Sequence, residues 1–323
     1  MSFRVIYNRQ EEAIDHKTAF AQTLEELMRE DPRVCYLDAD LMNSSGTFKL
    51  WKAHPDRIFN VGIAEANMMG IAGGLSAQGK IPYVHTFAPF ASRRSFDQTF
   101  ISIAYAGNHA IIYGSDAGIT AEFNGGTHMP FEDMALMRSI PGATVVDPAD
   151  SVQFRSILRS AKDMSGVVYI RSSRKKHAAL YAEGSEFEIG KGVVIKDGRD
   201  LTIIACGFML AEALEAAALL EKEGVSIRVL DMFTVKPLDT ELVIRCAEET
   251  GAIVTAENHN IIGGLGEAVA AALCENRPVP MKRHGVEDRF GQVGPVSYLR
   301  DVYGLGAEAL AASCRSVLAR KKN

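Results

Sequence analysis

The sequence has no long hydrophobic run. No stretch reaches about 18 consecutive apolar residues, the length that spans a bilayer, and the most hydrophobic region, 201–220, is interrupted by Glu212 and Glu215. The N-terminal segment is polar and charged and lacks the apolar core of a signal peptide. We therefore expect a cytoplasmic protein that does not bind membranes.

Cysteine and positive charge are also scarce. The five cysteines are an odd number and form neither a CxxC motif nor a metal-type spacing with histidine, which favours reduced, mostly buried thiols. Lysine and arginine number 35 against 40 aspartates and glutamates, and this net charge of −5 gives no reason to expect a nucleic acid partner. With 47% hydrophobic and 23% charged residues, disordered, collagen-like and coiled-coil chains are excluded.

What is present is a regular alternation of short apolar runs and helical patterns. Strands are predicted at 34–37, 58–61, 81–84, 110–113, 144–146, 167–170, 201–205, 227–230 and 252–255. Helices are predicted from about residue 8 and at 64–78, 92–106, 134–139, 151–162, 209–223, 239–250 and 264–274. This order is typical of an α/β protein whose mostly parallel sheets carry helices on both faces.

The segment 175–192 breaks this rhythm. It carries Gly184, Gly190 and Gly192 among scattered charges, as an interdomain linker does. At about 100–200 residues per domain, the length of the chain predicts two domains. We expect the first at 1–180 and the second at 181–323, each a three-layer α/β/α domain.

Four loops lie at predicted carboxyl ends of strands, where open parallel sheets bind their ligands. These loops, at 38–46, 62–67, 86–94 and 114–130, are polar or rich in glycine. The last reads GSDAGITAEFNGGTHMP, and a loop of this length in a compact domain is usually functional or disordered.

Glu65 follows a predicted strand and opens a helix rich in alanine and glycine. An acidic residue in the first turn of a helix is stabilised by the helix dipole, and spacing alone favours this structural interpretation. The alternative is an acid buried among apolar neighbours, where the loss of solvent tunes its pKa for proton transfer.

The neighbouring aromatic and basic residues also leave two interpretations open. Phe87 and Phe90 are either core aromatics or a stacking platform for a flat heterocycle. His128 ends the long loop, where a packing role is less common than elsewhere. Arg171 and Arg174 are either solvated charges or a clamp for an anion. Since no P-loop, HExxH, GxSxG or full GxGxxG motif occurs, these residues alone predict only a ligand-binding α/β protein.

Taken in order, the motifs resemble those of the C-terminal half of transketolase, a thiamine-diphosphate enzyme. The first domain carries FNVGIAEANM at 59–68, YVHTFAPF at 83–90, SD at 115–116, GTHMP at 126–130, VDPAD at 146–150 and RSSR at 171–174. The second carries VLDM at 229–232, PLD at 237–239, ENH at 257–259 and GGLG at 263–266. The resemblance covers nearly the whole chain and implies a pyrimidine-binding domain followed by a transketolase C-terminal domain.

Members of this family also have a domain that binds the diphosphate and Mg²⁺ and carries a Gly-Asp-Gly segment with an Asn further on. No Gly-Asp-Gly occurs in these 323 residues. The resemblance therefore implies one subunit of a split enzyme, active only with an N-terminal subunit that supplies this motif. The low polarity of the helix that begins near Glu65 suits burial against a second subunit, and we expect a heterotetramer of two chains of each kind.

The resemblance also implies residue roles in transferring a two-carbon ketol unit from a ketose to an aldose. Glu65 would hydrogen-bond N1′ of the cofactor's aminopyrimidine, and Phe87 and Phe90 would stack on that ring. Asp40 matches a family residue near the thiazolium, and Ser44 matches a contact to the substrate phosphate. His128 would touch the donor's hydroxyls, and Arg174 would clamp the terminal anion of the acceptor.

Two positions depart from the family pattern. Ser115 stands where transketolases have a His, and Asn124 is nearest to an Asp that contacts a donor hydroxyl. Both departures favour a ketose related to the standard sugar phosphates, with phosphate or another terminal anion. The alternatives are the β subunit of a 2-oxo acid dehydrogenase, an enzyme like 1-deoxyxylulose-phosphate synthase, and a non-catalytic scaffold subunit.

Overall fold

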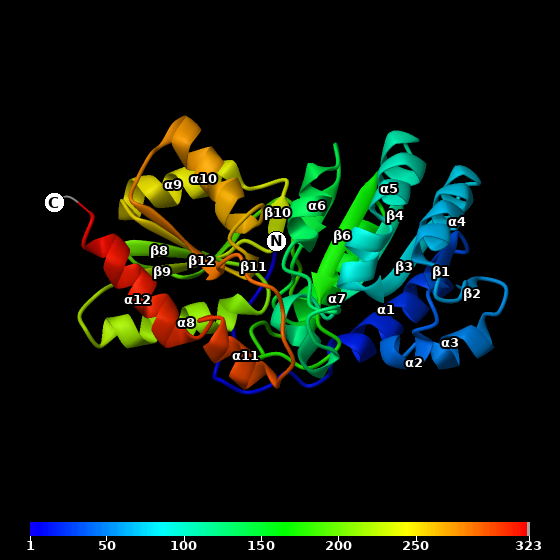
Figure 1. Cartoon of the computed structure of the whole chain (residues 1–323), viewed down its shortest axis with the longest axis horizontal. Coiled ribbons are helices and arrows are strands. Elements are labelled where there is room, and N and C mark those ends of the chain that lie inside the picture. Colours follow the sequence, from blue (N-terminus) through cyan, green and yellow to red (C-terminus); the bar gives the residue numbers. More distant parts are fainter. Residues whose placement is uncertain (322–323) are drawn as a thin grey trace.

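Two separate β-sheets organise the chain (Figure 1). The computed structural model describes residues 1–321. The first sheet has seven strands in the order β10-β5-β6-β4-β3-β1-β2, and the second has five in the order β12-β11-β8-β9-β7. All neighbouring strands are parallel except β10 on β5 and β7 on β9. The α/β class and its mostly parallel sheets are thereby confirmed.

The first half contains most of the first sheet and ten helical segments. Its strands are β1 (Val34–Asp38), β2 (Ile58–Asn60), β3 (Ile81–Phe87), β4 (Ala110–Ser115), β5 (Thr144–Val146) and β6 (Val167–Ser172). Its α-helices are α1 (His16–Glu30), α2 (Met42–Ser45), α3 (Phe48–Ala53), α4 (Glu65–Ala77), α5 (Phe96–Gln98), α6 (Asp133–Ser139) and α7 (Ser151–Ala161). Two π-helical segments, η1 (Phe90–Arg94) and η2 (Thr99–Tyr105), and one 3₁₀ segment, η3 (Gly118–Asn124), complete it.

The second half repeats the layered arrangement. Its sheet contains β7 (Val193–Lys196), β8 (Leu201–Ala205), β9 (Ile227–Asp231), β11 (Ile253–Asn260) and β12 (Met281–Val286), while β10 (Thr234–Lys236) crosses to the first sheet. Its helices are α8 (Met209–Glu221), α9 (Thr240–Thr250), α10 (Leu265–Asn276), α11 (Val296–Val302) and α12 (Ala307–Leu318). None of the helices within residues 1–321 combines the length and apolarity needed to cross a bilayer.

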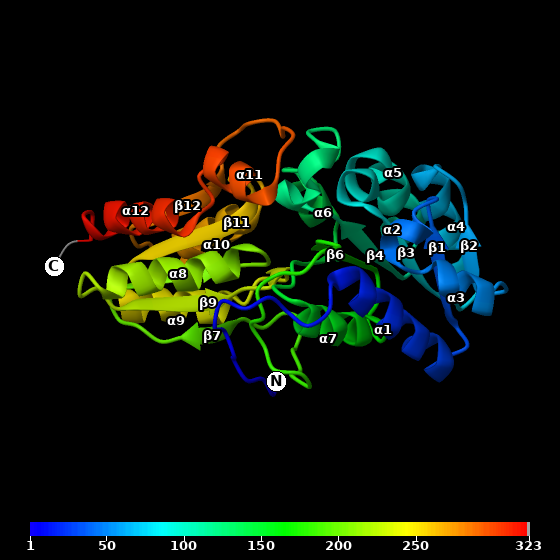
Figure 2. The same cartoon turned by 90° about the horizontal axis from the view of Figure 1, so that it is seen from below.

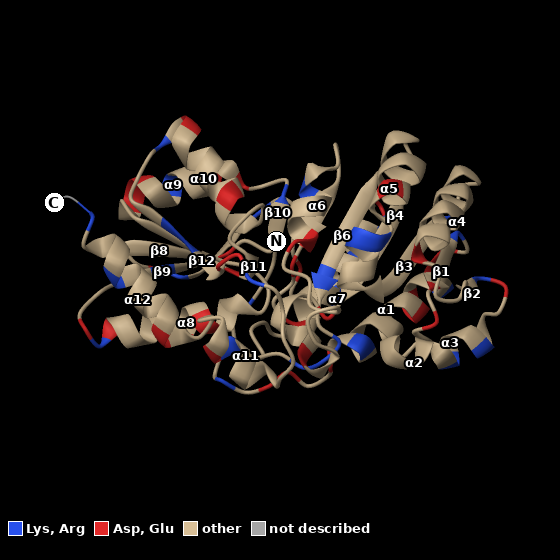
Figure 3. Cartoon of the chain, viewed as in Figure 1, with Lys and Arg blue, Asp and Glu red and all other residues tan. Residues whose placement is uncertain are grey.

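Helices cover both faces of each sheet, because successive strand residues point to opposite sides. In β3, Tyr83 joins the apolar cluster that contains Phe20 of α1, while Val84 joins the cluster that contains Met68 of α4. Viewed from below, α8 and α9 enclose the second sheet in the same way (Figure 2). Acidic and basic residues are interspersed over the helices of both halves (Figure 3).

The first helix begins later than predicted. Asp15 is its N-cap and accepts a hydrogen bond from the backbone N–H of Thr18 at 2.9 Å, so the helix runs from His16 and not from about residue 8. Residues 2–11 instead form isolated β-bridges with 178–186. The predicted linker is therefore covered by the N-terminal segment, which crosses between the halves in Figure 2.

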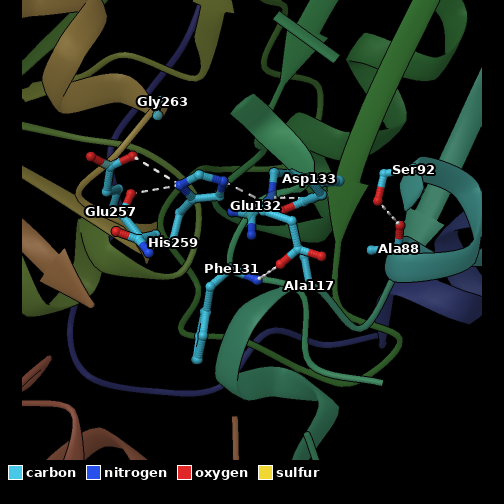
Figure 4. Close-up of polar contacts among 12 residues, drawn as sticks. Ala88, Ser92, Ala117, Phe131, Glu132, Asp133, Glu257, His259 and Gly263 are labelled. Carbon is cyan, nitrogen blue, oxygen red and sulfur yellow. Dashed lines mark hydrogen bonds and ion pairs between the residues drawn. The ribbon is translucent and has the colours of Figure 1, made fainter. Parts of the chain in front are cut away.

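The single helix predicted at 92–106 is also wrong in detail. The segment is divided into η1, α5 and η2. The hydroxyls of Ser92, Ser95 and Thr99 each donate to the carbonyl four residues before, at 2.7, 3.0 and 3.0 Å, and such bonds bend helices. Figure 4 shows the first of these, from Ser92 to Ala88. The irregular turn directs Arg94 toward Glu65 at the start of α4, and Phe90 toward Phe87 and His128.

A buried carboxylate lies where the two halves meet. Oδ2 of Asp231, at the end of β9, accepts hydrogen bonds from Nε2 of Gln153 at 2.8 Å and from the hydroxyl of Tyr181 at 2.6 Å. Burial raises the pKa of Asp231 from its ordinary value to about 7. Since the folded state then holds a proton that the unfolded state has lost, stability decreases as the pH rises through this window.

We expect Asp231→Asn to remove this pH dependence, because the amide stays neutral and its oxygen can accept both hydrogen bonds. Between pH 5 and 7, the free energy of unfolding of the variant should gain about 2 kcal/mol relative to the unsubstituted protein. Denaturant unfolding at both pH values measures this gain, with the exposed Asp301→Asn as the control. Equal pH slopes for the unsubstituted protein and Asp231→Asn would contradict the expectation.

Candidate functional site

The candidate site lies at the carboxyl ends of neighbouring parallel strands. Asp38 of β1 is opposite His85 of β3, and Phe87 of β3 is opposite Ser115 of β4. Since β6 continues the same parallel pairing, with Ser172 opposite Ser115, the loops that follow these four strands leave one edge of the sheet.

Glu65 is the first residue of α4, and its side chain is only 2% exposed. Nη1 of Arg94 donates to both carboxylate oxygens at 2.9 Å, and the hydroxyl of Thr86 donates to Oε1 at 3.3 Å. Glu65 is thus an acidic residue in the first turn of a helix, as the structural interpretation predicted, and it is also buried, with an arginine and a hydroxyl as its partners. No pattern in the sequence indicates that Arg94 is its ion-pair partner.

Three rings gather beside this carboxylate. Phe87 and Phe90 make an edge-to-face contact with centroids 6.2 Å apart, and the ring of His128 lies 5.5 Å from the first and 5.0 Å from the second. Arg94 lies over Phe90 at 3.8 Å. Burial and the charge of Arg94 lower the pKa of His128, which keeps its imidazole neutral at pH 7.

Arg174 closes the other side of the ring cluster. Its guanidinium lies 4.8 Å from the centroid of Phe87, and its Nε donates to Oδ2 of Asp116 at 2.8 Å. Asp116 has a φ of 58° and is buried, so this ion pair holds a backbone conformation that costs free energy. Nη2 lies 2.6 Å from the same oxygen, which leaves Nη1 as the part of the guanidinium available to an anion.

A buried polar chain lies beneath the cluster. The hydroxyl of Ser115 lies 3.0 Å from Nε2 of His85, whose Nδ1 lies 3.2 Å from Oδ2 of Asp38. Tyr36 donates its hydroxyl proton to the same Asp38 oxygen at 2.5 Å. Sequence reasoning noted Ser115 as a departure from the family pattern but missed its partners, because they depend on the register between strands.

Three other candidate residues lie apart from the rings. Asp40 is exposed with a φ of 64° and accepts a hydrogen bond from Nδ2 of Asn60 at 3.0 Å. Ser44 is half-buried in α2, and Asn124 is exposed at the end of η3. Across residues 1–321, none of the three makes a hydrogen bond, ion pair or ring contact with the Glu65 cluster.

Arg171 is not an anion clamp. Its side chain is 1% exposed, and its Nε and Nη1 donate to Asp133 and Asp147, both at 2.8 Å. Its Nη2 donates to the backbone carbonyl of Asn258, in the second half, at 3.0 Å. Figure 4 shows Asp133 beside His259, which in turn lies beside Glu257. The ENH segment at 257–259 therefore belongs to a buried contact between the halves.

Two family models match the chain. The transketolase pyrimidine-binding domain matches residues 12–178, and the transketolase C-terminal domain matches residues 190–310. A solved structure described as a split-gene transketolase, inactive β4 tetramer, is 44% identical, with a TM-score of 0.90 over 96% of this chain and 100% of that one.

Relatives of known name agree with these matches. A 6-deoxy-6-sulfo-D-fructose transketolase subunit from Clostridium sp. (strain MSTE9) is 48% identical over 94% of this chain and 95% of its own length. An apulose-4-phosphate transketolase subunit from Phocaeicola vulgatus is 35% identical over 94% and 96%. Human transketolase is 35% identical over 94% of this chain but only 49% of its own length. The chain belongs to the transketolase family and is the pyrimidine-domain and C-terminal-domain subunit of a split transferase that works with a partner subunit.

Proposed function

We propose that this subunit supplies the pyrimidine-binding side of a thiamine-diphosphate active site for two-carbon ketol transfer. The observation that carries the proposal is the buried carboxylate of Glu65 beside the rings of Phe87 and Phe90. Mg²⁺ and the cofactor's diphosphate would be held by an N-terminal subunit with the Gly-Asp-Gly…Asn motif.

The residues present fit an aminopyrimidine. Its flat ring suits the edge-to-face pair of Phe87 and Phe90, and its ring nitrogen needs a hydrogen-bonding acid in a site with little water. Glu65 meets that need, while Arg94, which is 45% exposed, can move toward solvent when Glu65 takes a new partner. Thiamine diphosphate would supply the stabilisation of the substrate carbanion, and Glu65 would hold and return the proton at N1′.

The substrate side favours an anionic sugar. The neutral imidazole of His128 can exchange hydrogen bonds with donor hydroxyls, and Nη1 of Arg174 can bind a terminal phosphate or sulfonate. We place Asp40 near the thiazolium, and Ser44 and Asn124 as further substrate contacts. The two named split-subunit relatives act on a sulfonated and a phosphorylated sugar respectively, which supports a ketose with a terminal anion.

The assembly we propose is a heterotetramer of two chains of each kind. Large apolar side chains are exposed just before α4, where Ile63 is 77% exposed, and on η2, where Tyr105 is 82% exposed. Exposed apolar groups of this size suit a subunit interface. We retain 1–180 and 181–323 as the domain division and the cytoplasm as the location. The latter is supported by five cysteines that form no disulfide within residues 1–321.

Reconstitution tests this function. Ketol transfer is measured with thiamine diphosphate and Mg²⁺ for this chain alone, for the N-terminal subunit alone and for the pair. We expect transfer only from the pair, and faster transfer from fructose 6-phosphate or 6-deoxy-6-sulfofructose than from fructose. Decarboxylation of a 2-oxo acid without ketol transfer would instead identify a dehydrogenase β subunit, and a pair that binds no cofactor would identify a scaffold.

A further inference from the structure

The loop between β12 and α11, residues 287–295, lies directly against the loop that carries His128. A Cβ atom added to Gly126 would lie 2.4 Å from the carbonyl oxygen of Gly291, and one added to Gly291 would lie 2.8 Å from Cβ of Met129. Both distances are too short for any side chain, so the two backbones touch. The second half of the chain therefore packs against the loop that carries His128, which we call the His128 loop (residues 118–131).

Tyr303, just after α11, connects the 287–295 loop to the His128 loop. Its hydroxyl donates to the backbone carbonyl of Phe290 at 2.8 Å, and its ring packs edge-to-face on Phe131 with centroids 5.2 Å apart. Arg289 lies 5.0 Å from the same ring centroid. Tyr303 therefore contacts the 287–295 loop through its hydroxyl and the His128 loop through its ring.

The His128 loop has further supports, since Nη2 of Arg93 donates to the carbonyl of Thr127 at 3.2 Å. Its backbone is held at Pro130, whose carbonyl accepts from Gly118, and at Phe131, whose carbonyl accepts from Asn260 of the second half. Between Gly126 and Phe131 lies an open pocket of about 520 Å³, lined on its other side by Asp288 and Gly291. The loop borders open space here, so the close approach of Gly126 and Gly291 is one of the contacts that position it.

We propose that the C-terminal half positions the His128 loop, and that Tyr303 is the positioning residue that orients His128. This inference rests on the proposed function, since that function makes the ketose donor the ligand that His128 contacts. Tyr303 touches no reacting atom, so its loss weakens donor binding while leaving the cofactor and the acceptor unaffected.

The test compares Tyr303→Phe with Tyr298→Phe, both in the full chain reconstituted with its partner subunit. Tyr298 is on α11 beside the same loop, and its hydroxyl makes no hydrogen bond within residues 1–321. We expect Tyr303→Phe to raise the KM for the ketose donor about threefold to tenfold, as the loss of one neutral hydrogen bond implies. The KM for the aldose acceptor should stay the same, and Tyr298→Phe should change neither.

Hydrogen–deuterium exchange gives a readout that needs no activity. In Tyr303→Phe, exchange should become faster in residues 118–131 and 287–295 and stay unchanged in the two sheets. Unchanged exchange in 118–131 would overturn the inference, as would equal rises in donor and acceptor KM. If the unsubstituted pair shows no ketol transfer, the proposed function fails, and faster exchange in 118–131 would still establish the coupling of the two loops.

Discussion

Replacing Glu65 by Gln is expected to lower the kcat of ketol transfer by roughly two to four orders of magnitude, the range over which a positioned acid–base group accelerates reactions. Gln retains the size of the side chain and one hydrogen-bonding oxygen, but it cannot take and return a proton. The change should also weaken the interaction between residue 65 and Arg94, which donates to both carboxylate oxygens of Glu65 at 2.9 Å. Steady-state transfer by the reconstituted pair measures the effect.

The matched control is Glu12→Gln. Glu12 is also a buried glutamate with a basic side chain beside it, since its Oε1 lies 3.1 Å from Nε2 of His16, but it lies away from the ring cluster. Its loss should reduce stability and leave the kcat of the folded pair unchanged. A Glu65→Gln pair with near-normal kcat would exclude Glu65 as the proton-handling group, whereas a loss of partner binding in both variants would point to misfolding.

The sheets are largely predictable from the sequence because their central strands are buried on both faces and read as continuous apolar runs. Ile203 and Ile204, for example, are adjacent in β8, and both are fully buried. The edge strands β10 and β12 lack this signal, whereas β7 has a short apolar run, VVI, that our prediction did not assign to a strand. The three residues of β10 and the polar MKRHGV of β12 carry no apolar run, so their place in the sheets depends on the rest of the fold.

The candidate site, too, is predictable from the sequence only in part. The gathering of Glu65, Phe87 and His128 at one edge of the sheet is predictable because parallel strands bring their carboxyl ends together there. The contacts of Arg94 and the buried polar chain from Asp38 to Ser115 are not, because they depend on a bent helix and on strand register. The sequence predicts that Arg171 is either exposed to solvent or bound to an anion. In the fold, it pairs instead with two buried aspartates.

Arg171→Met is expected to lower the free energy of unfolding by about 3–5 kcal/mol, because it leaves buried carboxylates without their cation. Burial alone would raise the pKa of Asp133, but Arg171 overcomes this effect and holds that pKa below its ordinary value. Without Arg171 the pKa of Asp133 should rise above its unfolded value, so the stability deficit should grow as the pH increases above about 4. Denaturant unfolding at pH 5.5 and 8 measures both effects.

Two further variants separate loss of charge compensation from loss of packing. Adding Asp133→Asn to Arg171→Met removes one uncompensated charge, and Tyr169 can still donate to the remaining amide oxygen, so part of the stability should return. Arg155→Met removes an arginine whose ion pairs with Glu26 and Glu183 are solvent-accessible, and it should cost less than about 1 kcal/mol. If the double variant were as unstable as Arg171→Met and the deficit did not change with pH, the contribution of Arg171 would be packing between the halves and not neutralisation of their buried acids.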